Sequence, residues 1–134
     1  MSEILQNKKI LIIDDEPSML KIVSEILKRE GAIPTSMSSV AEGLKASEVA
    51  MYDAIILDRY LPECDGHDVL KKLKSSPETK TKPVIMLTGE KNIKEVKASI
   101  DLGAVGYIVK PFTPKDFLGQ LHKILDNKAP IDTE

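Results

Sequence analysis

Five short runs of apolar and β-branched residues recur along the chain, and longer stretches with helical spacing separate them. The runs are KKILIID (8–14), IPTSM (33–37), DAIILD (53–58), PVIMLT (83–88) and VGYIVK (105–110). Three of them are almost continuously apolar, which is typical of strands that are covered on both faces. The pattern therefore predicts buried parallel strands.

The first two stretches between the strands differ in the strength of their helix signals. Pro17 suits the first position of a helix, and apolar residues then recur at helical spacing until Gly31 ends the pattern. A second helix is expected to begin at Ser38 or Ser39. Its apolar face is weaker and consists of Val40, Ala41, Leu44 and Val49.

The last three stretches predict three further helices. The third has to end before Pro77, and the fourth ends near Gly103, where a left-handed residue is favoured. The last helix opens at Thr113, a candidate N-cap that is followed by proline. The third helix carries the apolar residues Val69, Leu70 and Leu73, and the fourth carries Ile93, Val96 and Ile100. The last is expected to bury Phe117, Leu121, Ile124 and Leu125.

Five alternations of strand and helix within about 120 residues favour an α/β fold with an open parallel sheet and helices on both faces. A chain of 134 residues is long enough for one ordinary core and short for two. We therefore expect residues 8–126 to form one domain, with an N-terminal extension at 1–7 and a tail or linker stub at 127–134.

Polar residues stand at the carboxyl ends of four predicted strands. The first strand delivers Asp14-Asp15-Glu16, the third Asp58, the fourth Thr88-Gly89 and the fifth Lys110-Pro111. In open α/β sheets the ligand crevice lies at this edge, so the sequence predicts that these groups meet there.

Three aspartates in one crevice repel one another unless a cation lies among them. A hard divalent ion with oxygen ligands is the natural partner, and Mg²⁺ prefers one or two carboxylates together with water and phosphate oxygens. A hydroxyl at Thr88 and an ammonium at Lys110 are suitable donors to phosphoryl oxygens. The set indicates phosphoryl transfer onto a carboxylate.

Composition narrows the function further. The net charge is −2, with 19 basic and 21 acidic residues, so the broad positive field used in nucleic-acid binding is missing from the sequence. No apolar run approaches the length of about 20 residues that crosses a bilayer, and the first residues do not resemble a signal peptide. The single Cys64 cannot form an internal disulfide. We expect a cytoplasmic protein that binds neither nucleic acid nor membrane.

Four motifs in order resemble one family. Asp14-Asp15, LDRYLP around Asp58, LTG at Thr88 and VKPF at Lys110 are similar to the receiver domain of two-component response regulators, including its single-domain chemotaxis type. The resemblance spans residues 8–126. It implies a flavodoxin-like, five-stranded parallel sheet of order 2-1-3-4-5 with five helices, and a signalling module that catalyses only its own phosphorylation and dephosphorylation.

The resemblance also implies roles for the acidic residues. Asp58 is expected to accept a phosphoryl group from a phosphohistidine, carried by a sensor histidine kinase or a histidine phosphotransfer protein. Asp15 is expected to bind Mg²⁺ directly and Asp14 mainly through water. Asp58 and the main-chain carbonyl of Tyr60 complete the protein ligands.

The remaining motif residues are expected to bind the phosphoryl group or to respond to it. Thr88 and Lys110 would bind its oxygens, helped by the amide of Gly89, and Tyr107 would act as an aromatic switch that follows Thr88. The Lys110-Pro111 bond resembles one that the family holds cis. A downstream effector would then read the face formed by the fourth helix, the fifth strand and the fifth helix.

One departure from the family pattern bears on the chemistry. Tyr60, two residues after the acceptor, is bulky at a position that influences attack by water, and we hypothesise that it slows hydrolysis of phospho-Asp58 together with Glu90. The two histidines, His67 and His122, are expected to be exposed on helices.

Three other functions were considered. A flavodoxin-like cofactor binder needs an anion-friendly loop after the first strand, whereas Asp14-Asp15-Glu16 repels anions. A haloacid-dehalogenase-like phosphohydrolase needs an Asp-x-Asp motif there, and the sequence has adjacent aspartates instead. A receiver that only binds partners, without phosphorylation, is disfavoured by the complete set of motif residues. Taken singly, each motif could be structural, for example Asp14 as a helix cap or Asp58 as the start of a turn.

Overall fold

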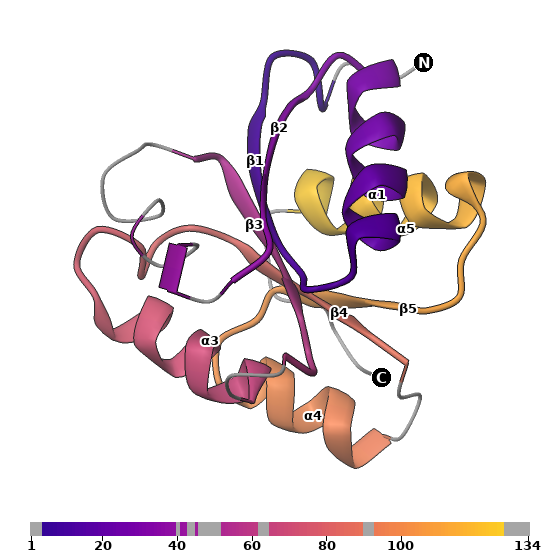
Figure 1. Cartoon of the computed structure of the whole chain (residues 1–134). Helices are drawn as coiled ribbons and strands as arrows, with labels where there is room; N and C mark the ends of the chain where they lie inside the picture. Colours follow the sequence, from indigo (N-terminus) through magenta and orange to yellow (C-terminus); the bar gives the residue numbers. More distant parts are fainter. Residues whose placement is uncertain are drawn as a thin grey trace.

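Five parallel strands form a single sheet in the order β2-β1-β3-β4-β5 in the computed structural model (Figure 1). The structure describes residues 4–39, 41, 42, 45, 52–61, 65–89 and 93–127. The strands are β1 (Lys9–Ile13), β2 (Ile33–Met37), β3 (Ala54–Asp58), β4 (Val84–Thr88) and β5 (Gly106–Val109). Neighbouring strands pair in parallel throughout. The predicted strands and the predicted strand order are confirmed.

Four helices are described, two on each face of the sheet (Figure 1). They are α1 (Pro17–Arg29), α3 (Gly66–Ser75), α4 (Ile93–Asp101) and α5 (Pro114–Asn127). Helices α1 and α5 cover one face, and α3 and α4 cover the other. None of these described helices is both long and apolar enough to cross a membrane.

The fifth predicted helix, after β2, lies largely outside the described residues, and so do its expected apolar residues Val40, Leu44 and Val49. Its start is visible. The hydroxyl of Ser39 accepts a hydrogen bond from the amide of Glu42 at 3.2 Å, as an N-cap does, and Ala41 and Glu42 are helical. The difference from the predicted five helices therefore concerns one segment.

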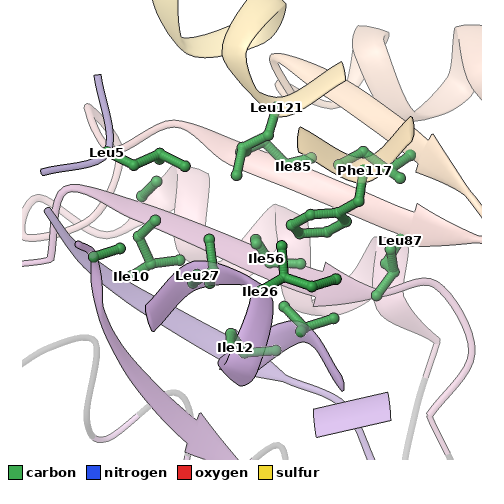
Figure 2. Packing of buried hydrophobic residues seen from close by; sticks show 14 of the residues in the cluster. Leu5, Ile10, Ile12, Ile26, Leu27, Ile56, Ile85, Leu87, Phe117 and Leu121 are labelled. Carbon is green, nitrogen blue, oxygen red and sulfur yellow. The ribbon is translucent and has the colours of Figure 1, made fainter. Parts of the chain in front are cut away.

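The core on the α1/α5 face joins strand residues to both helices (Figure 2). Ile10, Ile12 and Ile56 project from the sheet toward Leu27 of α1 and Phe117 of α5, and all five are fully buried. Alternate strand residues point to opposite faces, so Leu11, Ile13, Ile55 and Leu57 pack instead with α3 in a second cluster. Both faces of the central strands are covered by helices, which explains their continuous apolar runs.

Leu5 belongs to the first cluster although it precedes β1. Its side chain is fully buried beside Ile10 and Leu121 (Figure 2). The amide of Asn7 donates to the carbonyl of Gly31 at 2.8 Å, which ties this segment to the end of α1. The segment 1–7, which was predicted to be an N-terminal extension, thus contributes a residue to the core.

Helix ends follow the expected chemistry. Gly31 and Gly103 adopt positive φ angles of 85° and 111°, the left-handed region that glycine enters without steric cost. Thr113 accepts a hydrogen bond from the amide of Asp116 at 3.0 Å, so it caps α5 as predicted. Asp65 caps α3 by accepting from the amide of His67.

Candidate functional site at the carboxyl end of the sheet

Three aspartates meet where β1 and β3 end. Ile13 of β1 pairs with Leu57 of β3, so the next residue on each strand, Asp14 and Asp58, reaches the same edge of the sheet. Carboxylate oxygens of Asp14, Asp15 and Asp58 lie within 4.8 Å of one another. Asp14 and Asp58 are buried and Asp15 is half-buried. The predicted convergence of these carboxylates is therefore present.

Asp14 is the most enclosed member of this cluster. Its residue is fully buried; Oδ1 accepts a hydrogen bond from the amide of Glu16 at 3.0 Å, and the buried Oδ2 has no hydrogen-bond partner among the described residues. Burial, the largest cause, and the nearby charge of Asp58 raise the pKa of Asp14 to about 6, although the hydrogen bond from the Glu16 amide and the charge of Lys110 oppose this shift. The unpartnered oxygen and the raised pKa both indicate a carboxylate that is adapted to a cation.

Lys110 provides the positive charge on the other side of Asp58. Its Nζ donates to Oδ1 of Asp58 at 3.2 Å and lies 3.6 Å from Oε1 of Glu16. Burial raises the pKa of Asp58, while Lys110 and the amide of Tyr60, which is 3.4 Å from the same oxygen, act in the opposite direction. Burial alone would lower the pKa of Lys110, but the carboxylates of Asp58 and Asp14 raise it. Lys110 therefore remains a cation at neutral pH.

The donor set fits a hard divalent cation. Three carboxylates and one ammonium leave an excess of negative charge at a largely buried edge of the sheet, and oxygen is the ligand that Mg²⁺ prefers. Asp14, Asp15 and Asp58 are the residues that would hold the ion. The role predicted for the main-chain carbonyl of Tyr60 stays a prediction.

Thr88 reaches the same edge on the neighbouring strand. Leu87 pairs with Asp58 and Thr88 pairs with Val109, which places the Thr88 residue, 6% exposed, between the ends of β3 and β5. Its carbonyl accepts from the amide of Lys110 at 2.7 Å. Thr88 thus stands at the same edge of the sheet as Asp58 and Lys110, as predicted, and its contact with a phosphoryl group stays a prediction.

The other expected residues lie around this edge. Gly89 is exposed, and a Cβ added to it would meet no atom within 4 Å, so sterics alone do not demand glycine there. Tyr107 is half-buried on β5 and packs against the second core cluster. The Lys110-Pro111 bond is cis, as expected. The roles of the Gly89 amide and of Tyr107 as a switch remain predictions, and Glu90 lies outside the described residues.

Two features of this region were not foreseen. Arg59, directly after Asp58, is 8% exposed and forms ion pairs with Asp65 and Glu95. His67, expected to be exposed, is half-buried and hydrogen-bonded to Ser99 at 2.8 Å. The expectation for His122 was likewise wrong, since it is half-buried. Strand alternation offered a usable signal for Arg59, because residues 55, 57 and 59 share the face that α3 covers.

Similarity to known proteins agrees with this geometry. Residues 10–122 match the response regulator receiver domain family. The chain is 34% identical over 124 residues to chemotaxis protein CheY-3 of Vibrio cholerae, covering 90% of this chain and 94% of that protein. It is 35% identical over 119 residues to the alkaline phosphatase synthesis transcriptional regulatory protein PhoP of Bacillus subtilis, covering 89% of this chain and 49% of that protein. The chain spans about half the length of the longer regulators that it matches.

Solved structures show the same fold. The chemotaxis response regulator CheY4 of Vibrio cholerae superimposes with a TM-score of 0.84 at 29% identity, covering 89% of this chain and 99% of that one. The receiver domain of a Pseudomonas aeruginosa sensor histidine kinase, with a magnesium ion coordinated in its active site cleft, gives a TM-score of 0.79 at 22% identity and covers 90% of this chain and 98% of that one. Together with the carboxylate cluster and its lysine, the family match establishes that this chain is a response regulator receiver domain of two-component signal transduction.

Proposed function

We propose that Asp58 accepts a phosphoryl group from a phosphohistidine in a magnesium-dependent reaction, and that the modification changes the face formed by α4, β5 and α5. The observation that carries the proposal is the contact of Lys110 Nζ with Asp58 Oδ1 at 3.2 Å, beside the carboxylates of Asp14 and Asp15. Lys110 thus already contacts the carboxylate of Asp58, and its ammonium group would remain close enough to contact the phosphoryl oxygens once the acyl phosphate has formed.

The chain's own residues perform the positioning. A carboxylate oxygen of Asp58 attacks phosphorus, the P–O bond forms as the P–N bond of the phosphohistidine breaks, and the leaving imidazole nitrogen keeps the electron pair and takes up a proton. Lys110 neutralises one of the phosphoryl oxygens, and the hydroxyl of Thr88 donates to another. Bound Mg²⁺ would supply charge neutralisation and orientation of the phosphoryl oxygens.

The signal then follows from added charge. Phosphorylation introduces about −1.5 to −2 charges and three acceptor oxygens at a site that is already rich in carboxylates. Thr88 and Lys110 sit at the ends of β4 and β5, so their closure on the new oxygens acts on the strands that carry the α4/β5/α5 face. An effector that prefers the altered face would read the signal.

The proposed reaction also bears on the phosphoryl donor and on the cellular location. Receiver domains interact with histidine kinases and with effectors, and we propose a sensor histidine kinase or a histidine phosphotransfer protein as the donor here. We place the exchange in the cytoplasm, in agreement with a sequence whose single cysteine cannot form an internal disulfide. The chain would have no substrate other than its own aspartate.

The test uses a small-molecule donor, so that no partner has to be known. The protein is incubated with phosphoramidate or acetyl phosphate, with Mg²⁺ or with EDTA, and intact mass is followed. We expect a gain of one phosphoryl group that needs Mg²⁺, is released by hydroxylamine and is lost in Asp58→Asn. The matched control is Asp53→Asn, directly before the opposite end of the same strand, and this variant should be phosphorylated normally. A wild-type protein that gains no mass with Mg²⁺ would overturn the proposal and favour a receiver that only binds partners.

A further inference from the structure

A chain of polar contacts links the end of β3 to α4. It consists of Arg59, Asp65, His67, Glu95 and Ser99, and we call it the polar seam. Nε and Nη2 of Arg59 donate to Oε1 of Glu95 at 3.1 and 2.9 Å, and Nη1 donates to Oδ1 of Asp65. The same Asp65 oxygen accepts from the amide of His67 at 2.9 Å, and Nε2 of His67 is hydrogen-bonded to the hydroxyl of Ser99 at 2.8 Å. The seam therefore joins one strand end to two helices.

The backbone of Arg59 is fixed on both sides. Its amide donates to the carbonyl of Leu87 on β4 at 2.9 Å, and its carbonyl accepts from the amide of Gly66 at 2.8 Å. The guanidinium also lies over the ring of Tyr60, 4.7 Å from the ring centroid. Since Arg59 directly follows Asp58, the backbone that holds Arg59 in place is continuous with the residue proposed as the acceptor.

Helix α4 has little apolar burial of its own. Ser99 is its only buried residue among those described, while Ile93 is 82% exposed and Val96 is half-buried. Helix α3, in contrast, buries Val69, Leu70 and Leu73. A helix that buries so few side chains depends more strongly on its polar contacts for its position.

Both polar anchors of α4 lie on one face. Glu95 and Ser99 are four residues apart, so they stack along the same side of the helix. Glu95 is bound by Arg59 and Ser99 by His67, and both partners come from the segment that starts at the end of β3. The position of α4 is thus tied to the acceptor strand through the seam.

We infer that Arg59 is a positioning residue whose ion pair with Glu95 sets the resting position of α4 and couples the acceptor strand to the face that an effector reads. The part of this inference that concerns phosphorylation rests on the proposed function. A guanidinium held by two carboxylates transmits any displacement of the β3 end to both helices. Loosening the Glu95 contact lowers the cost of moving α4, so the altered position becomes more populated.

The decisive variant is Glu95→Gln, which keeps the size of the side chain and removes its charge. Asp101→Asn is the matched control, because it makes the same charge change on the same helix at an exposed carboxylate with no hydrogen bond or ion pair to another described residue. Backbone amide chemical shifts of α4 are measured by NMR without any phosphoryl donor. In the Glu95→Gln variant we expect these shifts to move along the line that joins the resting protein and the protein saturated with beryllofluoride, an analogue of the phosphoryl group.

Linkage gives a second, quantitative readout. If Glu95→Gln favours the altered position, the affinity for beryllofluoride with Mg²⁺ has to rise by the same factor. We expect a gain of about three- to tenfold, the range for a half-exposed charge-assisted pair, and no gain for Asp101→Asn. Arg59→Gln should also raise the affinity for beryllofluoride. Its effect should not be additive with that of Glu95→Gln, since both substitutions remove the same ion pair.

The outcomes separate this inference from the proposed function. The seam's role would be overturned if the α4 shifts of the Glu95→Gln variant moved no further toward their beryllofluoride-bound positions than those of the Asp101→Asn variant. If the wild type binds beryllofluoride, an equal affinity of the Glu95→Gln variant for this probe would overturn it as well. If the wild type does not bind beryllofluoride, the proposed function fails. The seam is then judged by the non-additivity of the Arg59 and Glu95 variants in urea unfolding. If Arg59→Gln does not fold, the Glu95→Gln shifts decide alone.

Discussion

The carboxylate of Asp14 should destabilise the fold at neutral pH when no divalent cation is present. Its residue is fully buried, Oδ2 has no hydrogen-bond partner in the described part of the chain, and Asp58 lies close by. Asp14→Asn removes the charge while it keeps the shape. We therefore expect the variant to be more stable than the wild type in EDTA.

The magnitude follows from the raised pKa. Burial raises the pKa of Asp14 from its ordinary value of 3.8 to about 6. A difference of about 2 in pKa, at about 1.4 kcal/mol for each, sets the cost of ionising this group in the fold at about 3 kcal/mol. Between these two pKa values the folded chain holds a proton that the unfolded chain has released. The contribution of Asp14 to the stability of the wild type therefore falls as pH rises from 3.8 to about 6 and is then level.

Urea unfolding in EDTA measures this effect at two pH values. The advantage of Asp14→Asn should be about 3 kcal/mol at about pH 7.5 and should shrink to about 1 kcal/mol at about pH 4.5, where the wild-type carboxyl is mostly protonated. Adding Mg²⁺ should reduce the advantage at the higher pH, because only the wild type keeps the full set of carboxylates. Asp101→Asn, at an exposed site, should stay within about 0.5 kcal/mol of the wild type under all conditions.

Two results would refute this reasoning. One is a wild type that is as stable as Asp14→Asn in EDTA at the higher pH. The other is an advantage of the variant that is the same at both pH values, because a gain from packing or hydrogen bonding does not depend on the ionisation of a carboxyl group.

Three further changes test other parts of the structure. Leu5→Ala should cost about 2 to 5 kcal/mol in urea unfolding because it empties a fully buried site, whereas Ile33→Ala, at a residue 49% exposed, should cost less than half as much; equal costs would contradict the role of Leu5 in the core. Tyr60→Asn should shorten the lifetime of phospho-Asp58, measured as loss of mass after the donor is removed, and an unchanged lifetime would rule out the shielding hypothesis. Gly89→Ala should leave stability in urea unfolding within about 1 kcal/mol of the wild type, since the added methyl group meets open space, and a larger loss would show that glycine is needed by the backbone.

The strands could be predicted from the sequence because a strand that is buried on both faces consists of almost continuously apolar residues. Each observed strand lies within one residue of its predicted run at either end. The site followed from the same signal, since the residue after a buried run stands at the edge of the sheet. Asp14 and Asp58 could be placed together because parallel strands align their carboxyl ends.

The parts that the sequence did not reveal are those that depend on single tertiary contacts. Leu5 is one apolar residue in a polar segment, and one residue has no periodicity. Arg59 resembles an ordinary turn residue until Glu95, 36 positions later, is placed beside it. His67 was expected to be exposed because nothing local predicts Ser99 as its partner. Pairs that are distant in the sequence become visible only when α4 is docked on the sheet.

The close approach at Gly66 has a consequence for protein engineering. A Cβ at this position would lie 2.5 Å from the carbonyl oxygen of Asp58 and 2.6 Å from that of Arg59. The start of α3 therefore packs directly against the peptide groups of Asp58 and Arg59. A chimaera that takes β3 from one receiver and α3 from another would bring together two surfaces shaped for other partners. The end of β3 and the first turn of α3 are best exchanged as one unit.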